Sequence, residues 1–594
     1  MTYAPSATWD LESVLPGGPG GDAFAREAEA LGAELASLTA QADALPAVPE
    51  PAALARVLLD LLALSERLDQ LGTFAGCSVA ADASGKAAIR ADSLANDLHN
   101  RFSRAWVVPN ARVGSCDEAL FSVLLALPEL AELQGLLLEK RRLARFRLPE
   151  QQEALAAELM RDGVSGWGEL YDMDAGALRI PFDRGNGLES LSPGQLSPLL
   201  GHDDKDLRDR ASAALQEGWR PIAPRAAKVL THLTGTRMVL NERRGLHMLD
   251  EPCANAKMEP RTLEAMIEAT RRARPLMRRY LAAKARHLGQ DSLSWADTYA
   301  QVGTGGGSHS YEDAQRFIVE QFESFSPSLS GFARRALEGR WVEVEDRPGK
   351  RGGGFCADLP LSRQSRIFMT WGGSARSLST LAHELGHAFH NHVLHQVPAA
   401  QRRVPMTLAE TASTFAELLV REASLAQVTD PGARLRLLDA SLSDALAFLA
   451  NIPARFELEQ ALYRMRAQGP LDPEALDAEC VSIFRDWYGP SVPQVDPTFW
   501  ISKLHFYIPT LSFYNFPYTF GYLFSNLVYE RFRPLGAAGA PGYEQLLRRT
   551  GDAWAEPIAQ EELGLDLGLP ETWTRALSPV ERDLEAFLAI VGEG

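Results

Sequence analysis

One short stretch of the sequence has the residue types and the spacing of a catalytic metal site. His383, Glu384 and His387 match the pattern H-E-x-x-H, in a region that holds five of the chain's 12 histidines. On a helix, residues four apart project from one face, so both imidazoles can bind one metal ion. Glu384 is rotated by ~100° from His383, which places it beside the ion as a general base for a water molecule. Chance would give roughly 0.02 such matches in a chain of this length.

The surroundings of this motif favour a metal site over an ordinary polar helix face. Leucine, alanine and phenylalanine residues alternate with the histidines, which predicts a buried helix over residues 378–394. Buried polar groups need partners, and a metal ion is a good partner for two imidazoles. His390 lies three residues past His387, and we interpret it as a packing residue or a hydrogen-bonding support for the site.

A catalytic zinc ion has three protein ligands and one position for water, so a third ligand is needed. The elongated form of the motif fails here, because its last histidine position is Val393. Residues 407–425 have the pattern of a second amphipathic helix, on which Glu410 and Glu417 share a face. These two carboxylates lie ~10 Å apart along such a helix, so at most one of them binds the ion. The spacing leaves four candidates, which are Glu410, Glu417, His390 and His392.

Glu410 also has a purely structural interpretation. Together with Thr407 it has the spacing of a capping box, in which the glutamate side chain only closes the start of a helix. Spacing alone therefore leaves both a metal ligand and a helix cap open at this position.

A third segment, residues 500–524, is rich in aromatic and hydroxyl side chains. It contains Tyr507, Tyr514, Tyr518, Tyr522 and the last histidine of the chain, His505. If a helix begins near Pro517, Tyr518 and Tyr522 lie on one face of it. Their hydroxyls, with the histidine, could donate hydrogen bonds to an oxyanion. The alternative is an aromatic core stripe whose tyrosines are satisfied at its edge.

The elements that must position these residues are mostly helices. Leu, Ala, Glu and Arg dominate the chain, and apolar residues recur three and four apart. Residues 341–345 and 366–371 have strand character and flank a triple glycine at 352–354. We therefore expect a mainly helical protein with one small antiparallel sheet next to the metal helix.

Composition limits the class of protein. The chain has 594 residues, of which 46% are hydrophobic and 23% charged, as in folded soluble proteins. A net charge of -17 argues against nucleic acid or an anionic membrane as a partner. Five scattered cysteines indicate a reducing compartment, and no signal peptide or membrane span is recognised, so we expect a cytoplasmic protein. A polar stretch near residue 200 predicts an N-terminal helical region at 1–200 and a catalytic region at 201–594.

The three segments together resemble the M3 family of zinc metallopeptidases. The nearest branch is oligoendopeptidase F, which is related to thimet oligopeptidase and neurolysin. The resemblance is clear over residues 340–530. It rests on His383-Glu-Leu-Gly-His387-Ala-Phe-His390, on Ala409-Glu410-Thr-Ala-Ser413, and on the segment from His505 to Tyr522.

This resemblance implies a fold and a set of site residues. The fold would be an elongated, two-lobed, mainly helical shell around a deep channel, with one Zn²⁺ at the channel floor. Glu410 would be the third ligand, with Glu417 as its support. The donors to the transition state would be His505, Tyr518 and Tyr522, with Tyr514 and Tyr507 as further candidates.

The resemblance also implies a zinc-dependent endopeptidase that hydrolyses internal bonds of short, unstructured peptides. The substrate main chain is expected to add as an extra strand alongside residues 366–371. One alternative is a zinc exopeptidase of the dipeptidyl carboxypeptidase type. Another is a non-catalytic, helical peptide-binding protein with a structural zinc ion. The expected partners are short peptides, and the oligomeric state stays open.

Overall fold

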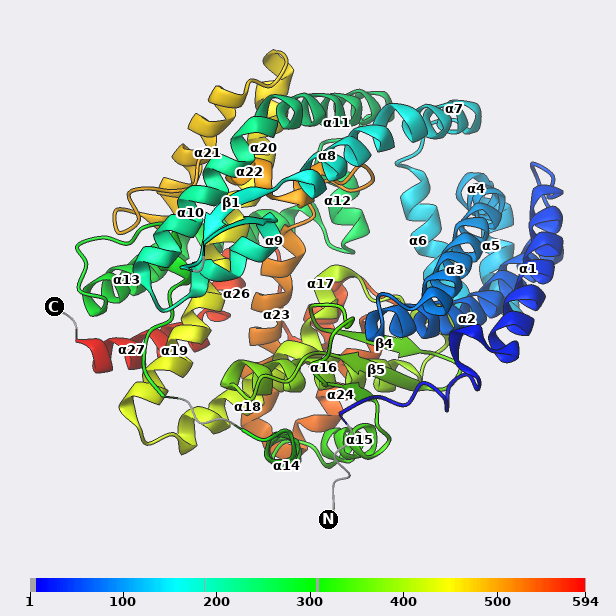
Figure 1. The fold of residues 1–594 in the computed structure, drawn as a ribbon. Helices are drawn as coiled ribbons and strands as arrows, with labels where there is room; N and C mark the ends of the chain where they lie inside the picture. Colours follow the sequence, from blue (N-terminus) through cyan, green and yellow to red (C-terminus); the bar gives the residue numbers. More distant parts are fainter. Residues whose placement is uncertain (1–6, 186, 306–308, 593–594) are drawn as a thin grey trace. The chain divides into compact units, whose positions relative to one another are not determined.

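Two units make up the chain, and each is assembled from three separate stretches. The computed structural model describes residues 7–592, except residue 186 and residues 306–308. Unit 1 comprises Met1–Arg145, Gly307–Ala426 and Leu527–Gly564; unit 2 comprises Phe146–Gly306, Gln427–Asn526 and Leu565–Gly594. Both units are built almost entirely of helices (Figure 1), which confirms the mainly helical fold expected from the sequence. The division at residue 200 stays a prediction.

Unit 1 contains an N-terminal group of helices, a small sheet and the helices that surround it (Figure 1). The N-terminal helices are α1 (Asp22–Asp43), α2 (Pro51–Ala81), α3 (Lys86–Ala105), α4 (Val107–Ser115), α5 (Glu118–Ala126) and α6 (Gln134–Ala144). The other elements are α14 (Tyr311–Glu323), α15 (Pro327–Glu338), β3 (Val342–Glu343), β4 (Phe355–Leu359), β5 (Gln364–Phe368), α16 (Ala375–Leu394), α17 (Met406–Ala409), α18 (Thr411–Gln427), α24 (Ala540–Arg549) and α25 (Ala555–Ile558). A further helix, α23 (Phe516–Phe532), begins in unit 2 and ends in unit 1.

The sheet of unit 1 has the strand order β3-β5-β4. Strands β4 and β5 are antiparallel, with Phe355 opposite Phe368 and Leu359 opposite Gln364, which confirms the small antiparallel sheet. The detailed pairing differs from the expectation, because the segments at 341–345 and 366–371 pair in parallel through β3 and β5. The antiparallel partner of β5 is instead the strand that follows the triple glycine.

The central position of β5 matters for peptide binding. The N–H groups of Ile367 and Met369 donate to carbonyls of Trp341 and Glu343, at 2.8 and 2.9 Å, so one edge of β5 is occupied by the β3 segment. The other edge pairs with β4. The expectation that a peptide adds alongside residues 366–371 is therefore wrong, and the open edge of this sheet belongs to β4.

The two faces of the sheet pack against different parts of unit 1. On one face, the ring of Trp9 lies 5.6 Å from the ring of Phe368, and Arg366 donates to the main-chain oxygen of Asp10 at 2.7 Å. On the other face, Asn391 of α16 donates to Ser365 of β5 at 3.1 Å. The sheet thus connects the N-terminal arm to the helix that carries the metal motif.

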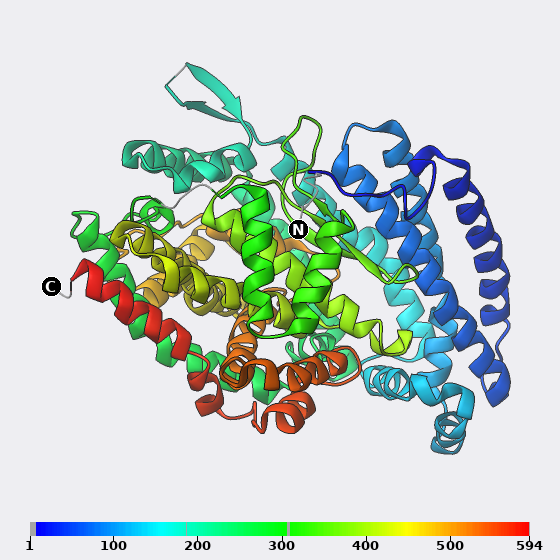
Figure 2. The ribbon, with the colours of Figure 1, turned by 90° about the horizontal axis from the view of Figure 1, so that it is seen from below.

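Unit 2 is helical apart from one hairpin. Its elements are α7 (Glu150–Met160), α8 (Gly166–Ala177), β1 (Ile180–Asp183), β2 (Leu188–Leu191), α9 (Pro193–Leu196), α10 (Lys205–Trp219), α11 (Ala223–Arg244), α12 (Asp250–Asn255), α13 (Pro260–His287), α19 (Pro431–Leu446), α20 (Ile452–Gln468), α21 (Pro473–Tyr488), α22 (Phe499–Ser502), α26 (Pro570–Arg575) and α27 (Ser578–Val591). Figure 2 shows the β1–β2 hairpin extending from the helices of this unit. Ile180 and Phe182 of β1 pack on Leu207 and Ala211 of α10.

One helical stretch of unit 2, Pro431–Gln468, is long and apolar enough by composition to cross a membrane. In its most apolar window, 61% of the residues are buried inside the protein, as in the core helix of a soluble protein. A second candidate, Glu118–Ala126 with Pro128–Ala144, passes the same test only as a pair bent by 101°.

Candidate metal centre

Helix α16 carries both histidines of the motif. It begins after Ser374, whose hydroxyl accepts a hydrogen bond from the N–H of Ser377 at 3.2 Å and so caps the helix. The rings of His383 and His387 lie 4.8 Å apart and at 85° to each other, on one face. The other faces are apolar and buried, through Leu378, Leu381, Leu385, Ala388 and Phe389. The predicted helix at 378–394 therefore exists and begins three residues earlier, at Ala375.

Glu410 lies at a break between two helices. Helix α17 ends at Ala409 and α18 begins at Thr411, and Glu410 has φ -83° and ψ 0° between them. The hydroxyl of Ser413 donates to its Oε2 at 2.8 Å, which fixes the carboxylate. A capping box needs its threonine just before a helix, whereas Thr407 is the second residue of α17, which follows Pro405.

A close approach at Gly386 sets the spacing of α16 and α18. A Cβ at this position would lie 2.6 Å from the oxygen of Ala412 and 2.6 Å from Cα of Ser413. Real Cβ atoms do not come so close, so only glycine allows the two backbones to approach in this way. This contact brings the carboxylate of Glu410 towards the two histidines.

The three side chains converge on one point. Oε2 of Glu410 lies 3.3 Å from Nε2 of His383 and 3.4 Å from Nε2 of His387. One ligand atom from each residue lies within 4.8 Å of the others. In a tetrahedral site with metal–ligand bonds of about 2.0–2.1 Å, ligand atoms are about 3.3–3.4 Å apart. The separations therefore fit a single metal ion held by two imidazoles and one carboxylate, a ligand set that leaves a position for water.

Glu384 lies beside this cluster without joining it. Its side chain is only 6% exposed, and its buried Oε2 has no hydrogen-bond partner among the described residues. Burial raises the pKa of its carboxyl group, while His383 and His387 act in the opposite direction. A carboxylate with an unused oxygen and a raised pKa is suited to accept a proton from water.

Two family models match the sequence. Residues 199–577 match the model described as Peptidase family M3, and residues 113–180 match the model described as Oligopeptidase F. The chain belongs to peptidase family M3. It is therefore a metal-dependent peptidase, and the cluster of His383, His387 and Glu410 is its candidate metal centre.

Individual relatives agree with this assignment. The plasmid-encoded oligoendopeptidase F of Lactococcus lactis subsp. cremoris is 24% identical over 456 residues, which is 75% of each chain. Oligopeptidase PepF of Bacillus subtilis (strain 168) is 23% identical over 452 residues, which is 74% of this chain and 66% of the relative.

Solved structures show the same fold. A protein of Chlamydophila abortus superposes with a TM-score of 0.83 at 18% identity, covering 99% of this chain and 98% of its own. Oligoendopeptidase-F from Enterococcus faecium gives a TM-score of 0.69 at 17% identity, covering 96% and 98%.

The charges in the metal centre of this M3 peptidase favour a cation. Burial alone would lower the pKa of His383, but hydrogen bonds with Glu410 and Glu417 raise it to about 10. Burial would raise the pKa of Glu410, yet His383 and His387 hold it well below its usual range. A metal ion and a proton compete for the same imidazole nitrogen, so these carboxylates also favour metal binding.

Glu417 contacts His383 on the side of the ring that faces away from Glu410. Its Oε2 lies 3.2 Å from Nδ1 of His383, the ring nitrogen that does not face Glu410. Ser379 donates to the other oxygen of Glu417 at 2.7 Å. A carboxylate in this position fixes the tautomer and the orientation of a metal-binding histidine. Glu417 was a candidate from its spacing, whereas nothing in the sequence indicated Ser379.

The remaining histidine candidates lie outside the metal cluster. Nε2 of His390 is 2.8 Å from the hydroxyl of Thr550, and burial lowers the pKa of His390 to about 4. The ring of His392 stacks on Phe332 at 4.9 Å. The packing and supporting role that we expected for His390 agrees with this placement.

Unit 2 brings together part of the predicted aromatic segment. The ring of His505 lies 4.7 Å from the ring of Tyr514, and the hydroxyl of Tyr518 lies 3.3 Å from that of Tyr514. Nδ1 of His505 contacts Oδ1 of Asn515 at 2.8 Å. Arg455 donates to the same oxygen, so the amide orientation is fixed and Nδ1 must carry the proton. Nε2 of His505 can then donate a hydrogen bond only when the ring is protonated.

Two tyrosines of this segment have other surroundings. The ring of Tyr522 stacks on Phe448 at 4.7 Å. Tyr507 is buried, donates to the main-chain oxygen of Trp500 at 3.0 Å and stacks on Tyr171 at 3.6 Å. Tyr507 is therefore a core residue with a satisfied hydroxyl, as the aromatic-core alternative predicts.

The open edge of β4 begins beside the metal centre. Alternate residues of a strand direct their main-chain groups to opposite edges. The N–H of Ile367 bonds to the β3 segment, so the main-chain groups of Arg366 and Phe368 point towards β4. In the register of β4 and β5, the main-chain groups of Cys356 and Asp358 then point away from β5, to the open edge. At the start of this edge, a Cβ at Gly354 would lie 3.6 Å from Oε1 of Glu384.

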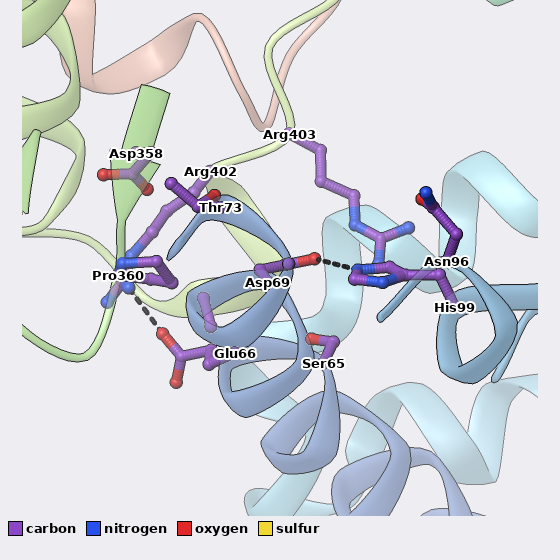
Figure 3. A pocket seen from close by; sticks show the side chains of 12 residues that line it. Ser65, Glu66, Asp69, Thr73, Asn96, His99, Asp358, Pro360, Arg402 and Arg403 are labelled. Carbon is purple, nitrogen blue, oxygen red and sulfur yellow. Dashed lines mark hydrogen bonds and ion pairs between the residues drawn. The ribbon is translucent and has the colours of Figure 1, made fainter. Parts of the chain in front are cut away.

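A polar cavity of about 560 Å³ lies at the other end of β4 (Figure 3). Asp358 and Pro360 form one wall, and α2, α3 and the segment after α16 form the others. Two ion pairs line the cavity, Glu66 with Arg402 at 2.6 Å and Asp69 with His99 at 3.3 Å. None of the candidate metal ligands lines it, so this cavity is distinct from the metal centre.

Proposed function

We propose that this M3 peptidase is a zinc-dependent oligoendopeptidase that hydrolyses internal bonds of short, unstructured peptides in the cytoplasm. The observation that carries the proposal is the convergence of His383, His387 and Glu410 beside a buried carboxylate, Glu384, with an unused oxygen. The names of the relatives, oligoendopeptidase F and oligopeptidase PepF, support the substrate class. Zinc suits this ligand set, which is that of hydrolytic zinc sites.

In the mechanism, His383, His387 and Glu410 would hold the zinc ion. The ion would supply Lewis-acid polarisation of the water molecule and of the scissile carbonyl. Glu384 accepts the proton of the attacking water at Oε2 and then passes it to the leaving amine. Glu417 keeps His383 in the tautomer whose Nε2 is free to bind metal.

The tyrosines Tyr518 and Tyr522 would donate hydrogen bonds to the oxyanion of the transition state. His505 would join them only in its protonated form, because its Nδ1 proton is already used by Asn515. Burial, Arg455 and Lys503 lower the pKa of His505, so its contribution would grow as the pH falls. In the structure the hydroxyl of Tyr518 donates to that of Tyr514, so Tyr514 would become the donor of this pair when Tyr518 donates to the oxyanion.

The substrate would bind as an additional strand on the open edge of β4. Hydrogen bonds to the main chain of Cys356 and Asp358 read the peptide backbone and tolerate varied side chains. From Gly354 beside Glu384 to Pro360 at the polar cavity, an extended chain spans roughly 20 Å. A peptide that fills this edge therefore extends about six residues from the scissile bond, which favours oligopeptides over dipeptides.

The deciding experiment combines a Glu384→Gln variant with peptides blocked at both ends. Glu384→Gln should retain zinc and lose cleavage roughly a thousandfold, because the general base is removed. Glu338→Gln, at the exposed end of α15, is the matched control and should retain full activity. Cleavage of capped peptides, mapped by mass spectrometry, separates an endopeptidase from a dipeptidyl carboxypeptidase. Retained cleavage in Glu384→Gln would refute the assigned role.

The non-catalytic alternative has a distinct signature. A structural zinc site closes its coordination with a fourth protein ligand and has no need of a buried general base. Among the described residues, the cluster offers three ligands. A protein that binds zinc and peptides but releases no cleavage products would support this alternative.

A further inference from the structure

Two basic side chains of unit 2 lie together against one aromatic ring. Arg455 of α20 and Lys503, which follows α22, approach the same ring, at 5.3 and 4.8 Å from the centroid of Phe499. Neither forms an ion pair with a carboxylate of the described residues. The negative charge of Asp496 acts on Lys503, but this carboxylate accepts hydrogen bonds from the N–H and hydroxyl of Thr498 instead, at 2.8 and 2.7 Å.

Two cations on one ring differ from the other arginines of unit 2. Some of those pair with acidic side chains, such as Arg208 with Asp297 at 2.7 Å, and others donate to main-chain oxygens, as Arg466 does to Thr231 at 2.9 Å. The net charge of the chain is -17. An excess of carboxylates makes it easy to neutralise a basic group. A pair of unneutralised cations in such a chain indicates that the counter-ion comes from a ligand.

Asn515 extends the basic pair with a hydrogen-bond donor. Its Oδ1 contacts Arg455 at 3.2 Å and His505 at 2.8 Å. An arginine can only donate, so the oxygen of the amide faces it and Nδ2 points elsewhere. Asn515 is 2% exposed, and its Nδ2 has no partner among the described residues. A buried donor without an acceptor is costly, so an oxygen from a ligand would stabilise the folded protein.

The basic groups of this cluster repel one another, and both burial and this repulsion lower the pKa of Lys503 and His505. Burial lowers the pKa of Lys503 to about 8; Arg455 acts in the same direction and Asp496 against it. Burial, Arg455 and Lys503 also lower the pKa of His505, while Asn515 opposes them. All three basic side chains are partly exposed, so a ligand can reach them. A negative charge bound here would replace this repulsion with attraction.

The types of donor identify the ligand. A guanidinium presents a planar pair of N–H groups that matches the two oxygens of a carboxylate, and an ammonium and an amide N–H add single bonds. We propose that Arg455, Lys503 and Asn515 form a carboxylate-binding site that selects acidic groups of the peptide substrate. This inference rests on the proposed peptidase function. The carboxylate can come from the C-terminus of the peptide or from an aspartate or glutamate side chain.

Binding is measured first, apart from catalysis. Calorimetric titrations use the zinc-loaded Glu384→Gln protein and three peptides of one sequence: a neutral peptide with an amidated C-terminus, the same peptide with a free C-terminus, and the amidated peptide with one glutamine changed to glutamate. We expect at least one acidic peptide to bind roughly tenfold more tightly than the neutral one. The advantage should shrink as ionic strength rises. Which acidic peptide gains affinity identifies the source of the carboxylate.

Variants then assign the effect. In the same background, Lys503→Met keeps the aliphatic stem against Phe499 and should remove most of the advantage of the acidic peptide. Arg455→Lys keeps the charge but loses the planar fork, and should leave a partial advantage. Lys228→Met, an exposed lysine of α11, is the matched control and should change nothing. The melting temperature of each variant verifies its folding.

The outcomes separate this inference from the proposed function. Equal binding of all three peptides, or an acidic advantage that survives Lys503→Met, overturns the carboxylate site. Loss of affinity for all peptides alike in Lys503→Met also overturns it, because the lysine would then act on the peptide backbone. Cleavage of the neutral peptide by the unmodified protein tests the peptidase function by itself, whatever the titrations give.

Discussion

A single methyl group at Gly386 tests whether the spacing of α16 and α18 sets the metal centre. In Gly386→Ala, the new Cβ would lie 2.6 Å from the oxygen of Ala412, 2.6 Å from Cα of Ser413 and 2.9 Å from Cβ of Ala416. Favourable contacts between heavy atoms begin at about 3.5 Å, so the two helices must separate locally by roughly 0.9 Å.

That separation is large on the scale of a metal site. Ser413 is one of the contacted residues, and its hydroxyl holds the carboxylate of Glu410, so the ligand moves with the backbone. Metal–ligand distances tolerate only about 0.2 Å. We therefore expect metal affinity to fall by about 10- to 100-fold, which is the effect of losing a side chain that supports a metal ligand. The overlap should also cost about 1–3 kcal/mol of stability in the metal-free protein.

A matched control separates this clash from the general effect of alanine in a helix. Gly176 lies in α8, and a Cβ there would meet nothing within 4 Å. Gly176→Ala should bind metal like the parent and keep its stability within about 0.5 kcal/mol, because the position is exposed and lies in the last turn of α8.

The assay is zinc binding in competition with a chromophoric chelator, together with thermal unfolding of the metal-free and metal-loaded proteins. The metal-free melting temperature of Gly386→Ala should fall below that of the parent, and zinc should raise it less. If Gly386→Ala binds zinc as tightly as Gly176→Ala, the close approach of the helices does not position Glu410, and the reasoning above fails.

Two further predictions concern carboxylates, the half-buried Glu417 beside His383 and the buried Glu459 of unit 2. Glu417→Gln removes the charge that orients His383, and chelator competition should show about 10- to 100-fold weaker zinc binding, with Ser379 still able to bond the amide; an unchanged affinity would contradict the supporting role. In unit 2, burial raises the pKa of Glu459 from 4.5 to about 7, although the N–H of Phe513 and the charge of Arg237 oppose the shift. The protonated form is favoured by folding, so this stability is present below pH 4.5 and is lost as the pH rises through 7, by about 3 kcal/mol in total. Glu459→Gln should therefore melt like the parent near pH 4.5 and at a higher temperature at pH 8, and parallel melting curves across this range would exclude the effect.

The metal helices were predictable because their information is local. The H-E-x-x-H spacing and the apolar residues around it define α16 without any knowledge of distant contacts. The strand pairing was not local in this sense. The segments at 341–345 and 366–371 have strand patterns, but their parallel pairing depends on the insertion of β4 after the triple glycine, at the other edge of β5. A pattern of alternating residues predicts which side chains of a strand share a face, but it does not predict which other strands pair with it.

The same distinction explains why the candidate metal centre could be predicted from the sequence and the basic cluster of unit 2 could not. The candidate ligands come from two consecutive stretches, α16 and the α17–α18 break, so one helical hairpin with a close approach at Gly386 suffices to bring them together. Arg455 comes instead from the first turn of α20, and it meets Lys503 at Phe499 only after two further helices have folded. No spacing rule connects such residues. The evidence for the cluster is electrostatic, because two cations approach one ring and neither has a carboxylate partner within the described part of this acidic chain. The lack of an acidic partner can be recognised only when the contacts of every nearby charged side chain are known, and these contacts are known only from the folded structure.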